Sequence, residues 1–98
     1  MTRDSAIAKL RGTTDAVRAL GATALYVYGS TVRGEARTES DVDLFIEYDP
    51  TKSFSLIDLA GIKVLLESEL GVEVDVTTRD SLHPLLSKRI LASAVRIF

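Results

Sequence analysis

The stretch YGSTVRGEARTESDVDLF, residues 28–45, joins two apolar runs and contains a Gly-Ser pair followed by two aspartates that are spaced by one residue. Gly29 has no side chain, so backbone N–H groups can approach an anion there, and Ser30 adds a hydroxyl donor. In a strand, residues two apart share a face, so Asp41 and Asp43 point to one side and the apolar residues around them to the other. Aspartate is a poor strand former, which makes a carboxylate pair unusual at this place. The stretch predicts a phosphate-binding turn beside two carboxylates.

Two arginines of the same loop extend this interpretation. Arg33 and Arg37 are four residues apart, so a helical turn would direct both to one side, where they would neutralise a polyphosphate. Each feature also has an ordinary explanation: a strand-ending turn for the Gly-Ser pair, a solvated strand face for the carboxylates, and surface charge for each arginine. The combination of a phosphate cradle and a carboxylate pair is much harder to explain in that way.

A third carboxylate comes from residues 72–77, VEVDVT, whose strict alternation is the clearest strand pattern in the chain. Asp75 lies on the polar face of this strand, where a solvated residue explains it equally well. If this strand is a neighbour of the one that begins at Val42, Asp75 joins Asp41 and Asp43 within reach of one metal ion. Mutual repulsion would then raise the pKa values of the three carboxyl groups unless a cation neutralised them, and Mg²⁺ is the obvious cation.

Periodicity and helix breakers predict the remaining elements. Gly21 and Gly71 would end two amphipathic helices, and Asp80 or Ser81 would cap a last one. The expected helices are residues 5–20, 54–70 and 83 to about 94; the expected strands are residues 24–28, 42–48 and 72–77; residues 95–98 form a short strand or dock on the core. This order predicts an α/β (α+β) fold with helices against a small sheet, in a single domain that spans residues 1–98.

Composition and charge exclude several classes of function. The net charge is −2 and the pI is near 5.3, whereas general binding to a nucleic-acid backbone needs a dense basic surface. The chain has no cysteine and one histidine, so thiolate and typical zinc sites are excluded and any metal would have oxygen ligands. We interpret that histidine, His83, as structural or surface-exposed. No signal peptide or membrane span is recognisable, which predicts a cytoplasmic location.

The central motif resembles that of a known family. A Gly-Ser pair, ten intervening residues and then Asp41-Val42-Asp43 are similar to the signature of the DNA polymerase β-like nucleotidyltransferases. The segment GSTVRGEARTESDVDLFIE is similar to the minimal nucleotidyltransferases, stand-alone antitoxins that are found beside HEPN-domain toxins. The resemblance implies a small mixed sheet with helices packed on one face.

The resemblance also implies a role for each motif residue. Gly29 and Ser30 would hold the triphosphate of ATP, and Arg33 would lie on its phosphates. The catalytic residues, which bind Mg²⁺, would be Asp41, Asp43 and Asp75. Two such ions, about 3.5–4 Å apart, would activate an attacking hydroxyl and stabilise the departing pyrophosphate.

For minimal nucleotidyltransferases with HEPN partners, the implied reaction is transfer of AMP from ATP to a tyrosine hydroxyl of the toxin, which blocks its RNase activity and implies a hetero-oligomer with the toxin. Two alternatives remain open. A small-molecule nucleotidyltransferase would use the same residues but usually needs an added domain, and a binding antitoxin would inhibit its partner by covering it. The apolar residues Ile97 and Phe98 would either pack on the chain's own core or contribute to a partner surface.

Overall fold

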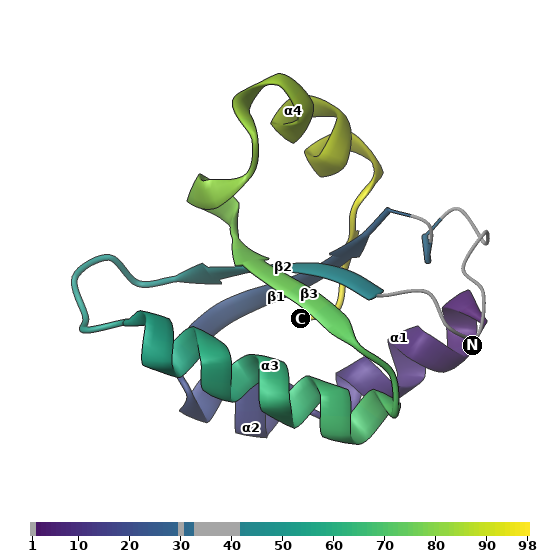
Figure 1. Cartoon of the computed structure of the whole chain (residues 1–98), viewed down its shortest axis with the longest axis horizontal. Helices are drawn as coiled ribbons and strands as arrows, with labels where there is room; N and C mark the ends of the chain where they lie inside the picture. Colours follow the sequence, from purple (N-terminus) through teal and green to yellow (C-terminus); the bar gives the residue numbers. More distant parts are fainter. Residues whose placement is uncertain (1, 30, 33–41) are drawn as a thin grey trace.

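The computed structural model describes residues 2–29, 31–32 and 42–98. The elements are α1 (Arg3–Arg11), α2 (Thr14–Ala19), β1 (Ala22–Tyr28), β2 (Val42–Tyr48), α3 (Leu56–Leu70), β3 (Val74–Thr78), the 3₁₀ turn η1 (Arg79–Ser81), α4 (Pro84–Ser93) and β4 (Val95–Arg96). Within the described residues the strands form one sheet in the order β3-β2-β1-β4 (Figure 1). β1 is antiparallel to both β2 and β4, whereas β2 and β3 are parallel, so the sheet is mixed.

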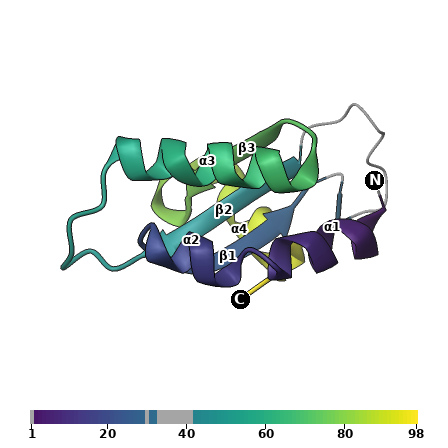
Figure 2. The ribbon, with the colours of Figure 1, turned by 90° about the horizontal axis from the view of Figure 1, so that it is seen from below.

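The helices divide between the two faces of this sheet. Figure 1 shows α1, α2 and α3 on one face and α4 on the other. Figure 2, which views the molecule from the side of α1, α2 and α3, shows these three helices lying across the strands. The predicted α/β fold with a small mixed sheet is confirmed. The expectation that the helices pack on one face holds for α1, α2 and α3 but is wrong for α4, because β3 and η1 lead the chain to the opposite face. We refer to the face that carries α4 as the open face.

The strands lie close to their predicted ranges. The prediction of residues 42–48 is confirmed at both ends by β2. β1 begins two residues before position 24, and β3 begins two residues after position 72. β3 begins late because its pairing with β2 begins at Val74, which lies opposite Val42.

The core fills the space between the sheet and α1, α2 and α3. Val42, Leu44 and Ile46 alternate along β2 and are all buried on this side, as the pattern predicts. They form one cluster with residues of β1 and α3, which include Leu25, Val27, Ile62, Leu66 and Leu70. Fully burying such a side chain contributes roughly 1.5–3 kcal/mol. Most of the stabilisation of the sheet therefore comes from this face.

The single helix expected over residues 5–20 is two helices, so that prediction is wrong. The chain breaks at Gly12 and Thr13, where the Thr13 hydroxyl donates a hydrogen bond of 2.6 Å to the carbonyl oxygen of Leu10. Leu10 and Val17 are nevertheless both fully buried. The break allows both short helices to place their apolar side on the sheet.

α3 begins with a capping box, in which the Ser55 hydroxyl accepts from the Asp58 N–H and the Asp58 carboxylate accepts from the Ser55 N–H. It ends at Gly71, which has a φ of 71°, as predicted. The helical spacing of Leu56, Leu59 and Ile62 predicts that all three are buried, but Leu56 is 83% exposed, because it lies at the edge of the apolar stripe, about 120° around the helix from Ile62. α3 has 15 residues, and no helix in the described ranges is long and apolar enough to cross a membrane.

His83 caps α4 through its side chain. Its Nδ1 accepts a hydrogen bond of 3.2 Å from the backbone N–H of Leu85, which is a structural role as predicted. The prediction that Asp80 or Ser81 caps this helix is wrong, because both residues lie in η1. Pro84 at the first helical position sets the start of α4 after His83.

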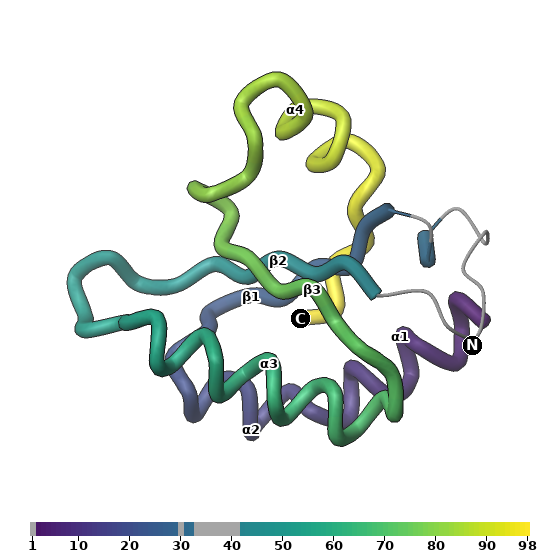
Figure 3. The backbone as a smooth tube through the Cα atoms, in the orientation of Figure 1, coloured from purple at the N-terminus to yellow at the C-terminus, as the bar shows by residue number. Residues whose placement is uncertain are grey.

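The last residues join the sheet, as the tube in Figure 3 shows for the end of the chain. Beyond β4, the Ile97 N–H donates to the carbonyl oxygen of Leu25 at 2.7 Å, and the Leu25 N–H donates to that of Phe98 at 3.2 Å. Ile97 is buried, and Phe98 packs against the core cluster. Of the two predictions for these residues, packing on the chain's own core is confirmed.

Candidate functional site

Asp43 and Asp75 occupy paired positions on neighbouring strands. β2 and β3 are in a register that places Asp43 beside Asp75, and β1 places Tyr28 beside Asp43 on the other side. Val42 and Leu44 are buried on the helix side, so the side chains between and beside them point to the open face. We call Tyr28, Asp43 and Asp75 the acidic row. Strand pairing thus brings together two carboxylates that are more than thirty residues apart in the chain.

Gly29 lies directly against one of these carboxylates. Its φ is 74°, a left-handed conformation that glycine adopts without a steric penalty. A β-carbon at this position would overlap Oδ2 of Asp43 and lie 3.3 Å from its Cγ. The missing side chain therefore lets the turn backbone contact Asp43, so any phosphate held by this turn would be beside that carboxylate.

The negative charges of Asp43 and Asp75 affect the pKa of the Tyr28 hydroxyl. Its pKa is raised from the usual value of 10.0, first by partial burial and then by the negative charges of Asp43 and Asp75. The sequence interpretation did not single out Tyr28. Its position directly before Gly29, on the strand that precedes the loop, is the signal that could have found it.

A pair of stacked rings forms the next row of the open face. Tyr26 and Phe45 are directly opposite one another on β1 and β2, with ring centroids 4.6 Å apart and an interplanar angle of 15°. Tyr28 packs against Phe45 at 5.7 Å. Phe45 is fully buried although it lies on the open face, which the alternating pattern of β2 did not predict. These rings therefore pack beside the acidic row and contact it through Tyr28.

The other predicted site residues lie outside the described residues: Ser30, Arg33, Arg37 and Asp41. Within the described ranges no group of three or more His, Cys, Asp and Glu side chains is placed to hold a metal ion. Asp43 and Asp75 fit Mg²⁺ chemically, because they present carboxylate oxygens side by side and Gly29 has no β-carbon to crowd them. Asp41 would supply a third carboxylate. The metal-binding role of these residues stays a prediction.

A cavity of about 700 Å³ lies between α4 and the far end of β2. Glu47, which forms an ion pair with Arg79, lines it, and so do Pro84, Ser87 and Leu91 of α4. Glu47 is four residues beyond Asp43, so the cavity begins about 13 Å from the acidic row. Sequence reasoning missed the cavity, because its walls come from strands and a helix that only the tertiary fold brings together.

A hydrogen-bonded cluster lines the edge of the same cavity. Asp80 accepts a bond of 2.6 Å from the Thr78 hydroxyl and one of 2.9 Å from the Tyr48 hydroxyl. These two bonds, that of Thr78 first, hold the pKa of the Asp80 carboxyl below its usual value of 3.8. The shared bond also raises the pKa of Tyr48. These hydrogen bonds connect η1 to the end of β2 and so fix the position of the segment that leads to α4.

A comparison with known families identifies the family of this chain. The model of the nucleotidyltransferase domain matches residues 10–97, which include Gly29, Asp43 and Asp75. This chain belongs to the nucleotidyltransferase domain family. The resemblance predicted from the central motif is therefore confirmed.

Two curated relatives cover most of this nucleotidyltransferase. A candidate protein adenylyltransferase of Methanocaldococcus jannaschii, MJ0435, is 46% identical over 71 residues, which are 72% of this chain and 74% of the relative. The protein adenylyltransferase MntA of Thermococcus cleftensis is 34% identical over 77 residues, which are 79% of this chain and 76% of the relative.

Solved structures confirm the minimal nucleotidyltransferase fold. A candidate minimal nucleotidyltransferase has a TM-score of 0.83 and 34% identity, over 97% of this chain and 95% of the other. A toxin-antitoxin complex with AMP-PNP has a TM-score of 0.71 and 18% identity, over 90% and 72%. A complex of the tri-AMPylated Shewanella oneidensis HEPN toxin with its MNT antitoxin has a TM-score of 0.63 and 15% identity, over 90% and 68%. At such low identity the last two likenesses concern the fold alone.

Proposed function

We propose that this nucleotidyltransferase is an antitoxin that transfers AMP from ATP to a hydroxyl of a HEPN-domain toxin, most simply a tyrosine, and thereby neutralises it. The observation that carries the proposal is the contact between Gly29 and the Asp43 carboxylate, with Asp75 in the paired position beside it. This juxtaposition serves a reaction in which a phosphate and a metal-binding carboxylate meet. Relatives of more than 30% identity bear the name protein adenylyltransferase, and a chain of the same fold was solved with an AMPylated HEPN toxin.

Different residues at and beside the acidic row have different roles in the proposed reaction. Gly29 and Ser30 bind the phosphates through backbone N–H groups and a hydroxyl, and Arg33 and Arg37 neutralise their charge. Asp43, which lies against the turn, is on the nucleotide side of the row.

The carboxylate of Asp75 is exposed on the edge strand β3, where an acceptor hydroxyl can reach it. Asp41, Asp43 and Asp75 would hold Mg²⁺, which when bound lowers the pKa of the acceptor hydroxyl and stabilises the negative charge of the leaving pyrophosphate. In the transfer, the acceptor oxygen bonds to the α-phosphorus while the bond from that phosphorus to the pyrophosphate oxygen breaks.

The direct test incubates the purified chain with ATP, Mg²⁺ and a candidate HEPN-domain partner, and then weighs that partner by mass spectrometry. We expect a gain of one or more AMP groups that disappears when a chelator replaces Mg²⁺. A partner of unchanged mass that is still neutralised would favour the alternative of a binding antitoxin. AMP on an added small alcohol instead of the protein would favour the small-molecule alternative.

Two substitutions separate nucleotide binding from transfer. Asp43→Asn should weaken ATP binding and abolish transfer together, because Asp43 is beside the phosphate turn. Asp75→Asn should keep most of the ATP affinity while the transfer rate falls by about a hundredfold or more, the size of the loss when one electrostatic stabiliser is removed. Calorimetry and single-turnover kinetics measure the two effects. Glu69→Gln on α3, exposed on the opposite side, is the matched control, and a native transfer rate in Asp75→Asn would contradict the site.

Thermal unfolding gives an independent readout of the same site. Mg²⁺ and ATP together should raise the melting temperature more than either alone, because the clustered carboxylates repel a free triphosphate and a ligand of the native state stabilises it. Equal ATP affinity with and without chelator would contradict the proposed metal-binding residues.

A further inference from the structure

α4 is the one helix in the described part of the chain, apart from the turn η1, that has no buried residue. Pro84, Ser87 and Leu91, on one side of the helix, line the cavity above the sheet. On its other side Leu85 is 84% exposed and Leu86 is 49% exposed. Leu56 and Ile57 of α3 are also exposed, but α3 buries its other side in the core, whereas α4 has no buried residue. The exposed apolar surface of α4 is therefore the one that the fold of the described residues does not use.

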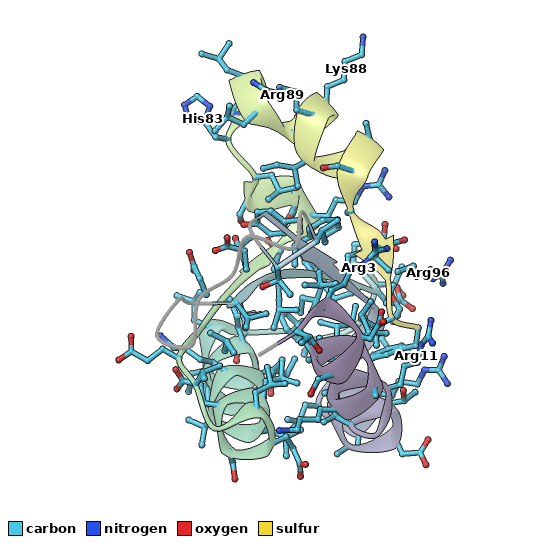
Figure 4. All side chains as sticks on the ribbon, turned by 90° about the vertical axis from the view of Figure 1, so that its right-hand side faces the viewer. Arg3, Arg11, His83, Lys88, Arg89 and Arg96 are labelled. Carbon is cyan, nitrogen blue, oxygen red and sulfur yellow. The ribbon has the colours of Figure 1, made fainter. Side chains whose placement is uncertain are left out.

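The charges of α4 are all of one sign. Lys88 and Arg89 are the only charged residues between Pro84 and Ser93, and no ion pair with either is present among the described residues. Figure 4 shows both at the end of the molecule that α4 forms, away from α1 and α3. We call Leu85, Leu86, Lys88 and Arg89 the outer face of α4. This apolar and cationic surface is complementary to an apolar surface that carries carboxylates.

The position of α4 agrees with the direction from which an acceptor must come. In an in-line phosphoryl transfer the attacking oxygen approaches opposite the leaving pyrophosphate. The phosphates lie at the Gly29 end of β1 in the proposed function, so the acceptor approaches from the other end of the open face. α4 begins there, after β3 and η1, and stands on the same face as Asp43 and Asp75 (Figure 1).

We propose that the outer face of α4 docks the protein that carries the acceptor hydroxyl, through an apolar surface of that protein with carboxylates around it. This inference rests on the proposed function, because the in-line direction assumes nucleotidyl transfer at the acidic row. It adds to that function the surface by which the acceptor is selected. Docking on α4 places a large acceptor beside the acidic row, which lies on the open face of the sheet.

The chain offers a closely matched control for this surface. Ile57 on α3 is 82% exposed, close to the 84% of Leu85, but lies on the opposite side of the sheet. Leu85→Asp and Ile57→Asp therefore make the same chemical change at equal exposure on two faces. Both variants should keep the native melting temperature within a few degrees, because neither side chain is buried.

Binding is measured by calorimetry against the HEPN-domain partner that is used in the transfer test, without nucleotide. Leu85→Asp should weaken this binding by about thirtyfold or more, as the loss of a central interface side chain does. Ile57→Asp should change it less than twofold. Arg89→Ser should weaken binding less than Leu85→Asp and should reduce its dependence on salt, because one charge pair is lost.

Kinetics distinguish docking from chemistry. Leu85→Asp should raise the KM for the HEPN-domain protein and leave kcat and the affinity for ATP with Mg²⁺ unchanged. The proposal is overturned if Leu85→Asp binds like the native chain, or if Ile57→Asp loses as much affinity. It is also overturned if sedimentation shows that Leu85→Asp only separates a dimer of this chain. Failure of the proposed function has a different result: the native chain then binds the HEPN-domain protein without transferring AMP, and the binding comparison still tests α4.

Discussion

The two faces of the sheet differ in how completely they are covered. On one face α1, α2 and α3 bury alternate side chains of β1 and β2, and α3 alone contributes the buried residues Ile62, Leu66 and Leu70. On the open face α4 buries none of its residues and borders an open cavity beside the sheet. The same strands serve both faces, because their side chains alternate.

This difference separates stability from function within one small sheet. Aliphatic burial on the face that α1, α2 and α3 cover, which we call the closed face, stabilises the strands and fixes their register. Asp43 and Asp75 can then stand side by side on the open face despite their like charge. The open face buries the ring of Phe45, but α4 leaves a cavity beside the rest of it.

The largest expected effect comes from removing a side chain of the closed face. Leu66→Ala should cost about 2–5 kcal/mol of unfolding free energy, because Leu66 is fully buried and its loss leaves a cavity. Leu86→Ala makes the same change on α4, where the side chain is 49% exposed, and should cost less than about 1 kcal/mol. Urea denaturation measures both. Equal losses would show that α4 is as tightly packed as α3 and would remove the distinction between the faces.

Ile97→Ala tests whether the end of the chain belongs to the closed face. Ile97 is buried in the core cluster and its N–H bonds to Leu25, so the substitution should cost about 2 kcal/mol, the lower end of the range for core truncations. Leu85→Ala, which truncates an exposed side chain, is the control. A loss below about 0.5 kcal/mol for Ile97→Ala would mean that the last residues do not contribute to the core.

Gly29→Ala tests the close approach on the open face, and Gly71→Ala is its control. Both glycines have a left-handed φ, of 74° and 71°, so each alanine should cost about 1–2 kcal/mol of backbone strain. A β-carbon at position 71 meets nothing within 4 Å, whereas one at position 29 overlaps the Asp43 carboxylate. Only Gly29→Ala should therefore also weaken binding of ATP with Mg²⁺, measured by calorimetry. Equal ATP affinity in the two variants would show that Gly29 does not contribute to the binding of ATP.

The smallest expected effect concerns Asp80 beside the cavity. Hydrogen bonds from Thr78 and Tyr48 lower its pKa in the folded state, so the stabilisation is present above the ordinary value of 3.8 and is lost as the pH falls through the folded value. Tyr48→Phe removes one donor and should move the pKa of Asp80, followed by NMR, back toward 3.8. An unchanged pKa in Tyr48→Phe would mean that the bond does not form in solution.

Local pattern was sufficient for much of this fold. Alternation over residues 42–48 predicts β2 and its buried side, and Gly71 predicts the end of α3, because strand periodicity and left-handed glycine caps depend on neighbours in the chain. The break at Gly12 and the exposure of Leu56 were not predictable in this way. Both depend on how each helix packs against the sheet.

The sequence by itself determined the acidic chemistry of this protein: a Gly-Ser turn, aspartates on the polar side of two strands, and a resemblance to nucleotidyltransferases that the family match confirms. Only the tertiary structure decided that β2 and β3 pair with Asp43 beside Asp75, that Tyr28 completes the row, and that Gly29 touches Asp43. It also decided that α4 stands over a cavity with its leucines exposed. The physical reason is that side-chain direction follows from local backbone geometry, whereas the neighbour of each side chain depends on strand register, which contacts between distant residues select together.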